Sequence, residues 1–133
     1  IDEGLSDFAA DSFDALVLSR TLPSLQRPLQ ALREMMRVAP LAVVSFPNFG
    51  HWRLRLDLMF RGRMPTSRTL PYPWHDSPNI RFCTITDFER LLTEGGWRVL
   101  ERRLLDVRGH PAAAPVGRRP NLLAAGAVYA ITR

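Results

Sequence analysis

The chain has 133 residues, 46% of them hydrophobic and 23% charged, which suits one globular α/β or α+β domain and is too short for two. No apolar run approaches the roughly 18 residues of a membrane helix, and the single cysteine excludes a disulfide framework and indicates a reducing compartment. The net charge of +5 comes from 18 basic residues, all of them scattered arginines. This pattern indicates codon composition and not a basic face, so nucleic-acid binding is the weakest functional reading.

The first predicted elements form a β-α-β unit. Residues 15–18 are a short apolar run between turn signals, which is typical of a strand buried on both faces. A helix is predicted over residues 28–37, because Pro28 suits the first helical position and an apolar stripe follows at helical spacing. The stripe consists of Leu29, Leu32, Met35 and Met36. Residues 41–46 are a second buried strand, so the two strands should be parallel with a right-handed crossover.

Residues 47–83 interrupt this alternation. A helix is predicted over residues 51–61, with Gly62 as its end, and one of its faces is apolar. That face comprises Trp52, Leu56, Met59 and Phe60. Residues 64–80 carry prolines and aromatics at a density that neither a helix nor a central strand accommodates. A long irregular connection in a compact domain is usually functional.

Regular structure is predicted to resume at Thr86-Asp87-Phe88-Glu89, which has the pattern of a helix capping box. This helix should end at Gly95-Gly96 and turn Phe88, Leu91 and Leu92 inward. Strands are predicted over residues 97–107 and 122–132, with a loop at 108–121 between them. Since no helix joins these two strands, they should be antiparallel neighbours.

Few residues carry a recognisable chemical motif. His51, His75 and His110 show no metal-ligand spacing, and Cys83 lies among apolar residues, which favours a buried structural thiol. The chain contains no Gly-x-Ser-x-Gly elbow and no Gly-x-Gly loop for a phosphate or dinucleotide. No metal is therefore expected.

Residues 47–52 are the strongest candidate for a site, because they leave the carboxyl end of a parallel strand, where open α/β sheets bind ligands. Asn48 can donate and accept hydrogen bonds, Phe49 and Trp52 offer apolar surface, and Gly50 permits an unusual turn. The alternative is that both aromatics cover the core. Tyr72 and Trp74, among prolines, form either a recognition surface or a packed loop.

Two sets of motifs resemble known families. Asp11-Ser12-Phe13-Asp14 before a buried strand, Arg27-Pro28, and Glu34-Met35-Met36-Arg37-Val38 resemble the fourth-strand region of class I S-adenosylmethionine-dependent methyltransferases. The sharper resemblance is to the methionine biosynthesis protein MetW family, and it covers nearly the whole chain. It is carried by Ser45-Phe46-Pro47-Asn48-Phe49-Gly50-His51-Trp52, Gly62-Arg63-Met64-Pro65, Leu70-Pro71-Tyr72, Trp74, Ser77-Pro78-Asn79-Ile80, Cys83-Thr84-Ile85, Asp87-Phe88 and Pro120-Asn121-Leu122-Leu123.

The resemblance implies an α/β fold of the Rossmann-like class I methyltransferase type, of which the chain would carry the C-terminal part, strands four to seven, as one partial domain. Residues 47–84 would be an insertion after the fifth strand. The glycine-rich turn and the ribose-binding acidic residue of the family would lie upstream. Asp2, Ser19, Arg20 and Thr21 would then be the residues nearest the cofactor. Arg81 departs from the histidine expected after Asn-Ile, which puts a proton-transfer role there in doubt.

The implied function is support of homoserine O-acylation in the cytoplasm of a bacterium, through binding of a homoserine O-acyltransferase of α/β-hydrolase fold. The partner or substrate surface would comprise Asn48, Phe49, His51, Trp52, Arg63, Tyr72, Trp74 and Asn79. S-adenosylmethionine would bind the full-length parent as an end-product signal, and residues 1–133 alone should not bind it. The alternative is a methyltransferase acting on a small molecule, with His51 as the nearby base or merely a helix-start residue.

Overall fold

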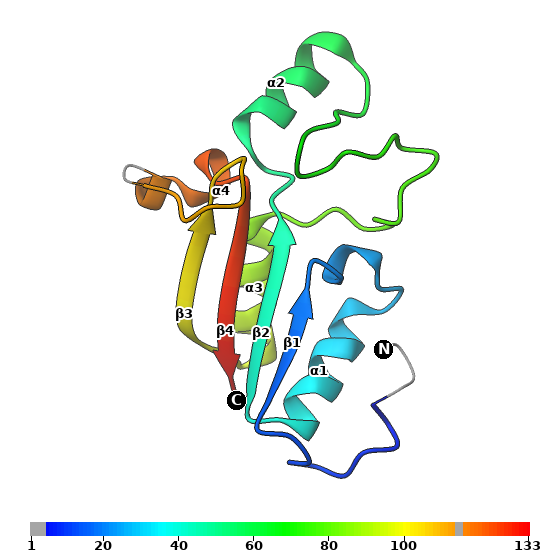
Figure 1. Cartoon of the computed structure of the whole chain (residues 1–133), viewed down its shortest axis with the longest axis vertical. Coiled ribbons are helices and arrows are strands. Elements are labelled where there is room, and N and C mark those ends of the chain that lie inside the picture. Colours follow the sequence, from blue (N-terminus) through cyan, green and yellow to red (C-terminus); the bar gives the residue numbers. More distant parts are fainter. Residues whose placement is uncertain (1–4, 114–115) are drawn as a thin grey trace.

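The structure, a computed structural model, describes residues 5–113 and 116–133. Its main elements are a four-stranded sheet and three helices of ten or eleven residues (Figure 1). In chain order they are β1 (Ala15–Ser19), η1 (Leu22–Ser24), α1 (Pro28–Val38), β2 (Leu41–Pro47), α2 (Trp52–Arg61), α3 (Ile85–Gly95), β3 (Arg98–Leu105), η2 (Val116–Arg118), α4 (Pro120–Leu123) and β4 (Gly126–Thr132). This confirms the predicted α/β order.

The sheet is mixed, with the strand order β1-β2-β4-β3. β1 and β2 are parallel, from Ala15 opposite Leu41 to Ser19 opposite Ser45, and α1 connects them as predicted. β4 is antiparallel to both β2 and β3. Within the described chain β1 is therefore an edge strand, with its outer side unpaired.

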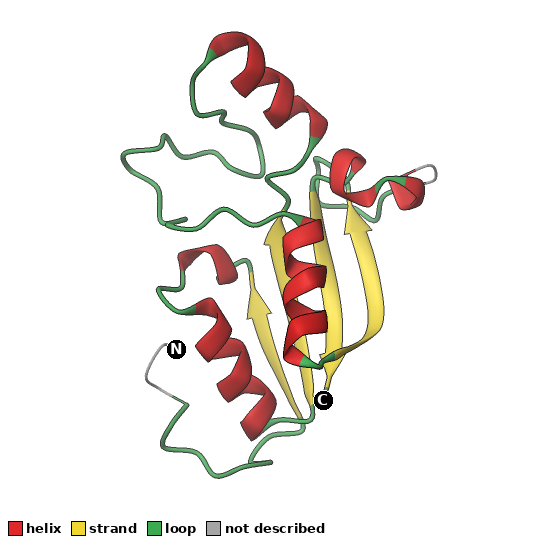
Figure 2. Ribbon diagram, turned by 180° about the vertical axis from the view of Figure 1, so that it is seen from behind, coloured by secondary structure: helices red, strands yellow, loops and turns green. Residues whose placement is uncertain are grey.

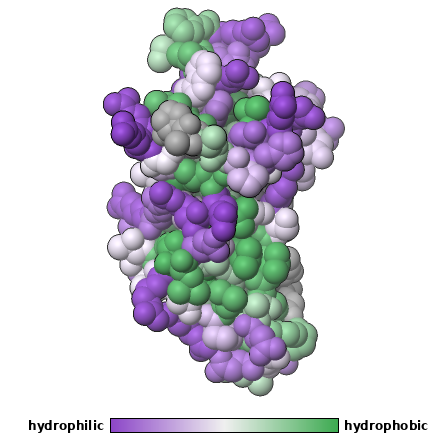
Figure 3. Space-filling model, turned by 60° about the vertical axis from the view of Figure 1, so that its left-hand side comes forward, coloured by the Kyte–Doolittle hydropathy of each residue, from purple (hydrophilic) through white to green (hydrophobic). Residues whose placement is uncertain are grey.

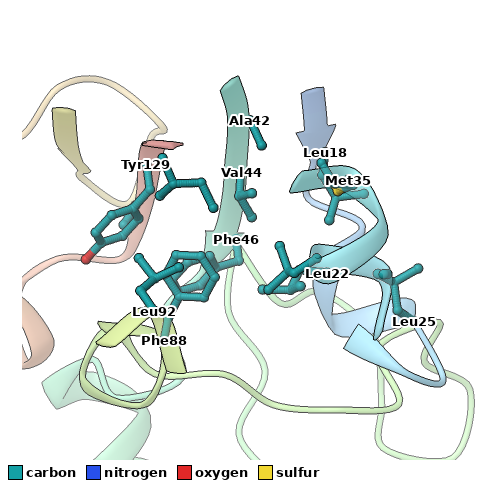
Figure 4. Packing of buried hydrophobic residues seen from close by; sticks show 14 of the residues in the cluster. Leu18, Leu22, Leu25, Met35, Ala42, Val44, Phe46, Phe88, Leu92 and Tyr129 are labelled. Atoms are coloured by element: carbon teal, nitrogen blue, oxygen red, sulfur yellow. The ribbon is translucent and has the colours of Figure 1, made fainter. Parts of the chain in front are cut away.

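Helices α1 and α3 cover one face of the sheet (Figure 2). Alternate residues of the two central strands point into this layer, where Phe46, Phe88 and Tyr129 form an aromatic centre with ring centroids 4.7–6.0 Å apart (Figure 4). The Tyr129 hydroxyl donates to the Glu89 carboxylate at 2.8 Å, and Arg102 donates to the same oxygen at 2.7 Å. These two hydrogen bonds at the rim of the core link α3 to β3 and β4.

The opposite face of the sheet has no helix over it in the described chain (Figures 1 and 2). The residues that alternate with the core positions lie on this face, and most are apolar: Ala15, Val17, Leu41, Val43, Val128 and Ala130. Val17 is 70% exposed, so the prediction that β1 is buried on both faces is wrong. Figure 3 shows a patch of apolar surface just below the middle of the molecule, with hydrophilic surface beneath it. We call these six residues the open sheet face.

Three local predictions also need correction. The capping box of α3 begins two residues earlier than predicted, because Thr84 and not Thr86 is the N-cap, with its Oγ accepting from the Asp87 amide and donating to the Asp87 carboxylate. Residues 120–123 form the short helix α4, so the last strand starts at Gly126. Leu29 is exposed, since the inward stripe of α1 passes through Ala31 instead.

Candidate functional site

Asn48, directly after β2, is fully buried and uses its whole side-chain amide within the protein. Its Nδ2 donates to the carbonyls of Asn121 and Ala124 at 2.9 and 2.8 Å. Its Oδ1 accepts from the amides of Gly50 and Ile85 at 3.0 and 3.2 Å. One side chain therefore joins the end of β2, the start of α3 and the α4 region. Asn48 holds the site together and does not face a partner, contrary to the sequence-based prediction.

Gly50 is required for space and not for an unusual turn. Its backbone is not left-handed, but a Cβ there would lie 2.8 Å from Asn121 Oδ1 and 2.9 Å from the Asn121 carbonyl oxygen. Asn121 Oδ1 also accepts from the Thr86 amide at 3.3 Å. Asn121 belongs to the motif Pro120-Asn121-Leu122-Leu123, and the sequence alone predicts no role for it.

His51 is the N-cap of α2 and is only 7% exposed. Its Nδ1 accepts from the Arg53 amide at 3.4 Å. Burial, with a smaller contribution from the Arg53 charge, lowers the pKa of His51, which favours the neutral imidazole. The structure thus supports the helix-start reading of His51, with a neutral ring at the base of the groove described next.

Helix α2 extends beyond the carboxyl end of the sheet (Figure 1). The predicted apolar face does not pack on the core: Trp52, Leu56, Met59 and Phe60 are all exposed, and Leu54 is the buried residue. Beside the helix lies a groove of about 650 Å³. Its residues include Trp52, Leu56 and Phe60 from α2, Thr66–Thr69 from the opposite wall, and His51 and Ala125. We call this the α2 groove.

Phe49 closes the base of the 47–84 segment. Its ring stacks on Phe82 with centroids 4.4 Å apart, and its amide donates to the Cys83 carbonyl at 3.0 Å. Burial raises the pKa of the Cys83 thiol to about 12, with a smaller contribution from Asp87, so the thiol stays protonated and unreactive at neutral pH. Phe49 therefore packs against Phe82 within this segment, whereas Trp52, which the same alternative placed over the core, is 39% exposed.

Ser19 ends β1, and Arg20 and Thr21 follow it at the carboxyl edge of the sheet. Ser19 and Arg20 line a cavity of about 260 Å³ together with Ser45 and Asp106. Arg20 has a left-handed backbone (φ 54°), its amide donates to Ser45, and its guanidinium donates to the Thr69 carbonyl at 3.1 Å. The Thr21 hydroxyl donates to the Ser19 carbonyl at 2.8 Å. Asp2 lies outside the described residues.

The other predicted partner residues lie on the irregular segment that follows α2. They are Arg63, Tyr72, Trp74 and Asn79. Trp74 is 75% exposed, and Tyr72 and Arg63 are also exposed. Asn79 is half-buried, and its Oδ1 lies 3.5 Å from the Ser24 hydroxyl. Tyr72 and Asn79 line a third cavity, of about 340 Å³, which Arg20 also reaches.

Arg81 fastens the end of the segment to the loop before α1. Its guanidinium donates twice to the Gln26 carbonyl, at 3.2 and 2.9 Å, and its amide donates to the Pro23 carbonyl. The sequence predicted neither this role nor that of Arg20, because both depend on carbonyl groups brought close only by the fold.

Across residues 5–113 and 116–133, no three side chains among His, Cys, Asp and Glu are grouped as a metal site would require. In the same part of the chain, no helix has the length and apolarity needed to cross a membrane.

A family model and a curated relative both place the chain in the same family. The family described as "Methionine biosynthesis protein MetW" matches residues 1–131. A curated relative from Rhodopirellula baltica, the bifunctional methionine biosynthesis protein MetXA/MetW, is 36% identical over the whole chain. The chain spans 21% of that relative's length.

Solved structures show the same fold at low sequence identity. An S-adenosylmethionine-dependent methyltransferase from Methanosarcina mazei matches with a TM-score of 0.59 at 16% identity, over 96% of this chain and 62% of that one. The [4+2]-cyclase SpnF matches with a TM-score of 0.57 at 15% identity, over 97% and 53% of the two chains. The fold is therefore that of class I methyltransferases, and it does not by itself imply methyl transfer.

Proposed function

The chain belongs to the methionine biosynthesis protein MetW family, and from this premise we propose that it acts as a partner or regulatory subunit of homoserine O-acyltransferase. The observation that carries the proposal is the relative in which MetXA and MetW form one bifunctional chain. Two activities fused in one polypeptide meet at a high effective concentration, which favours a functional contact between them. The proposed setting is cytoplasmic methionine biosynthesis.

Residues 47–84 are, in this proposal, an insertion that serves recognition. The segment is long, irregular in its second half, and exposes the side chains of Tyr72 and Trp74 to solvent. It is nonetheless fastened at its ends, by Asn48 at the start and by Arg81 and the Phe49–Phe82 stack near the end. A fastened segment with exposed aromatics loses little entropy on binding, and aromatic anchors carry much of the energy of protein interfaces.

Alanine in place of Trp74 or Tyr72 should weaken the complex with homoserine acyltransferase about 30-fold, equivalent to about 2 kcal/mol, without loss of folding. The measurement is a titration of the two purified proteins, paired with an acyltransferase assay. The matched control is Val99→Ala, an exposed apolar residue on β3, which should leave binding unchanged. Unchanged binding and activity in both loop variants would instead favour the methyl-acceptor reading below.

S-adenosylmethionine enters the proposal as an end-product signal in the full-length parent. Ser19 and Arg20, at the carboxyl edge of the sheet, would form only one wall of a site for S-adenosylmethionine. The cavity at Ser19 and Arg20 is about 260 Å³, below the usual size of ligand pockets, and Asp106 there already accepts from the amides of Arg108 and His110. The residues present do not by themselves fit the cofactor.

Residues 1–133 should accordingly show no binding of S-adenosylmethionine tighter than about 1 mM in calorimetry. The chain has no Gly-x-Gly turn to hold the methionine part of the molecule. Micromolar affinity for these residues alone would contradict this expectation.

The second candidate function is a methyltransferase acting on a small molecule, and the α2 groove favours it. A volume of about 650 Å³ lies within the range of small-molecule sites, and the neutral His51 lines it. In that case His51→Gln would lower the turnover of a small methyl acceptor, a reaction that the partner function does not require.

A further inference from the structure

Helix α2 has an apolar face that no described part of the chain covers. Trp52, Leu56, Met59 and Phe60 recur at the spacing of one helical face, and Phe60 is 77% exposed. The helix is nevertheless held firmly at both ends. Arg55 Nε donates to the Gly50 carbonyl at 2.5 Å near its start, and Gly62, with a left-handed backbone, caps its end.

The opposite wall of the α2 groove is also held in place. Ser67 and Leu70 exchange backbone hydrogen bonds of 2.9 and 3.1 Å, which form a tight turn. Arg20 donates from the sheet edge to the Thr69 carbonyl in the same turn. An apolar helix face on one side and a fastened polar turn on the other make a preformed groove, which is the arrangement that receives an amphipathic segment of another protein.

The charge of the groove restricts what it can accept. Arg53, Arg61 and Arg68 line it, and the one carboxylate among its lining residues, Asp57, is paired with Arg61 at 3.1 Å. Arg55 and Arg63 add positive charge on and just after the helix. An occupant should therefore place apolar side chains on α2 and carboxylates at the rim.

We infer that the α2 groove is the docking site for an amphipathic, acidic segment of the homoserine acyltransferase. This inference rests on the proposed function, and it adds the α2 groove to the Tyr72–Trp74 loop as a second part of the same contact. The fused MetXA/MetW relative supports this choice of occupant, since it holds both proteins in one chain. The excess of arginine around the groove supports the acidic character of the segment.

The test compares glutamate substitutions on two faces of one helix. Leu56 and Phe60 line the groove, whereas Leu58 is similarly exposed (43%) but does not line it. The protein and the acyltransferase are purified separately, and one is titrated against the other. The double variant Leu56→Glu/Phe60→Glu should bind at least 30-fold more weakly, and Leu58→Glu should bind as the unchanged protein does. Circular dichroism confirms that each variant is folded.

A second pair of variants tests the charge. Arg53→Glu/Arg68→Glu should weaken binding at least tenfold and flatten its dependence on salt, whereas Arg33→Glu on the exposed side of α1 should do neither. The docking inference is wrong if the unchanged protein binds the acyltransferase and the groove variants bind it equally well. It is also wrong if Leu58→Glu weakens binding as much as the groove variants do. In both cases the proposed function stands. If the unchanged protein shows no binding, the proposed function itself fails.

Discussion

Replacing Asn48 by alanine is expected to destabilise the fold by about 3 kcal/mol or more, because each buried polar group left without a partner costs about 1–3 kcal/mol. The substitution removes four hydrogen bonds and leaves two carbonyls and two amides without their partner. Urea denaturation followed by tryptophan fluorescence measures the change. We also expect proteolysis within residues 47–84 to become faster, since Asn48 anchors their start.

Asn79→Ala is the matched control for this prediction. Asn79 is half-buried, and its side chain makes one long contact, 3.5 Å from the Ser24 hydroxyl. Loss of this contact should lower the free energy of unfolding by less than about 1 kcal/mol. Equal destabilisation by the two substitutions would show that the buried amide of Asn48 does not organise this region.

Residues 1–133 on their own should self-associate through the open sheet face and the unpaired edge of β1. Both surfaces are apolar, and uncovered apolar sheet surface next to a free strand edge promotes association. Val17→Lys places a charge at a 70% exposed apolar position on that face and should shift the chain toward monomer. Sedimentation velocity measures the shift, and binding of a hydrophobic dye should fall in parallel.

Leu29→Lys is the control for Val17→Lys, since Leu29 is exposed on α1, on the covered side of the sheet. It should leave association unchanged. A monomeric sample of the unsubstituted chain with a sharp, cooperative thermal transition would contradict the prediction.

The sequence was sufficient for elements whose signals are local. The β-α-β unit, the stop at Gly62 and the antiparallel final strands follow from apolar runs, spacing and turn residues, and all are confirmed. The capping box was misplaced because Thr84 and Thr86 offer the same hydroxyl two residues apart.

The site was less predictable, because its residues act through distant partners. Asn48 looks like a ligand-binding residue in sequence, yet its four partners come from residues 2 to 76 positions away. The apolar face of α2 looks like a core face, and only the position of the helix beyond the sheet shows that it is exposed. Periodicity reveals that a helix has an apolar side, but not what that side meets.

Arg20 contacts both the carboxyl edge of the sheet and the α2 groove. Its amide is bound to Ser45 at the carboxyl edge of the sheet, and its guanidinium holds the turn that forms one wall of the α2 groove. A ligand at the edge that drew this guanidinium away from Thr69 would alter the groove, and an occupant of the groove would alter the affinity of the edge by the same factor. Through one arginine, binding at the sheet edge and binding in the α2 groove would be thermodynamically linked, with no larger rearrangement of the fold.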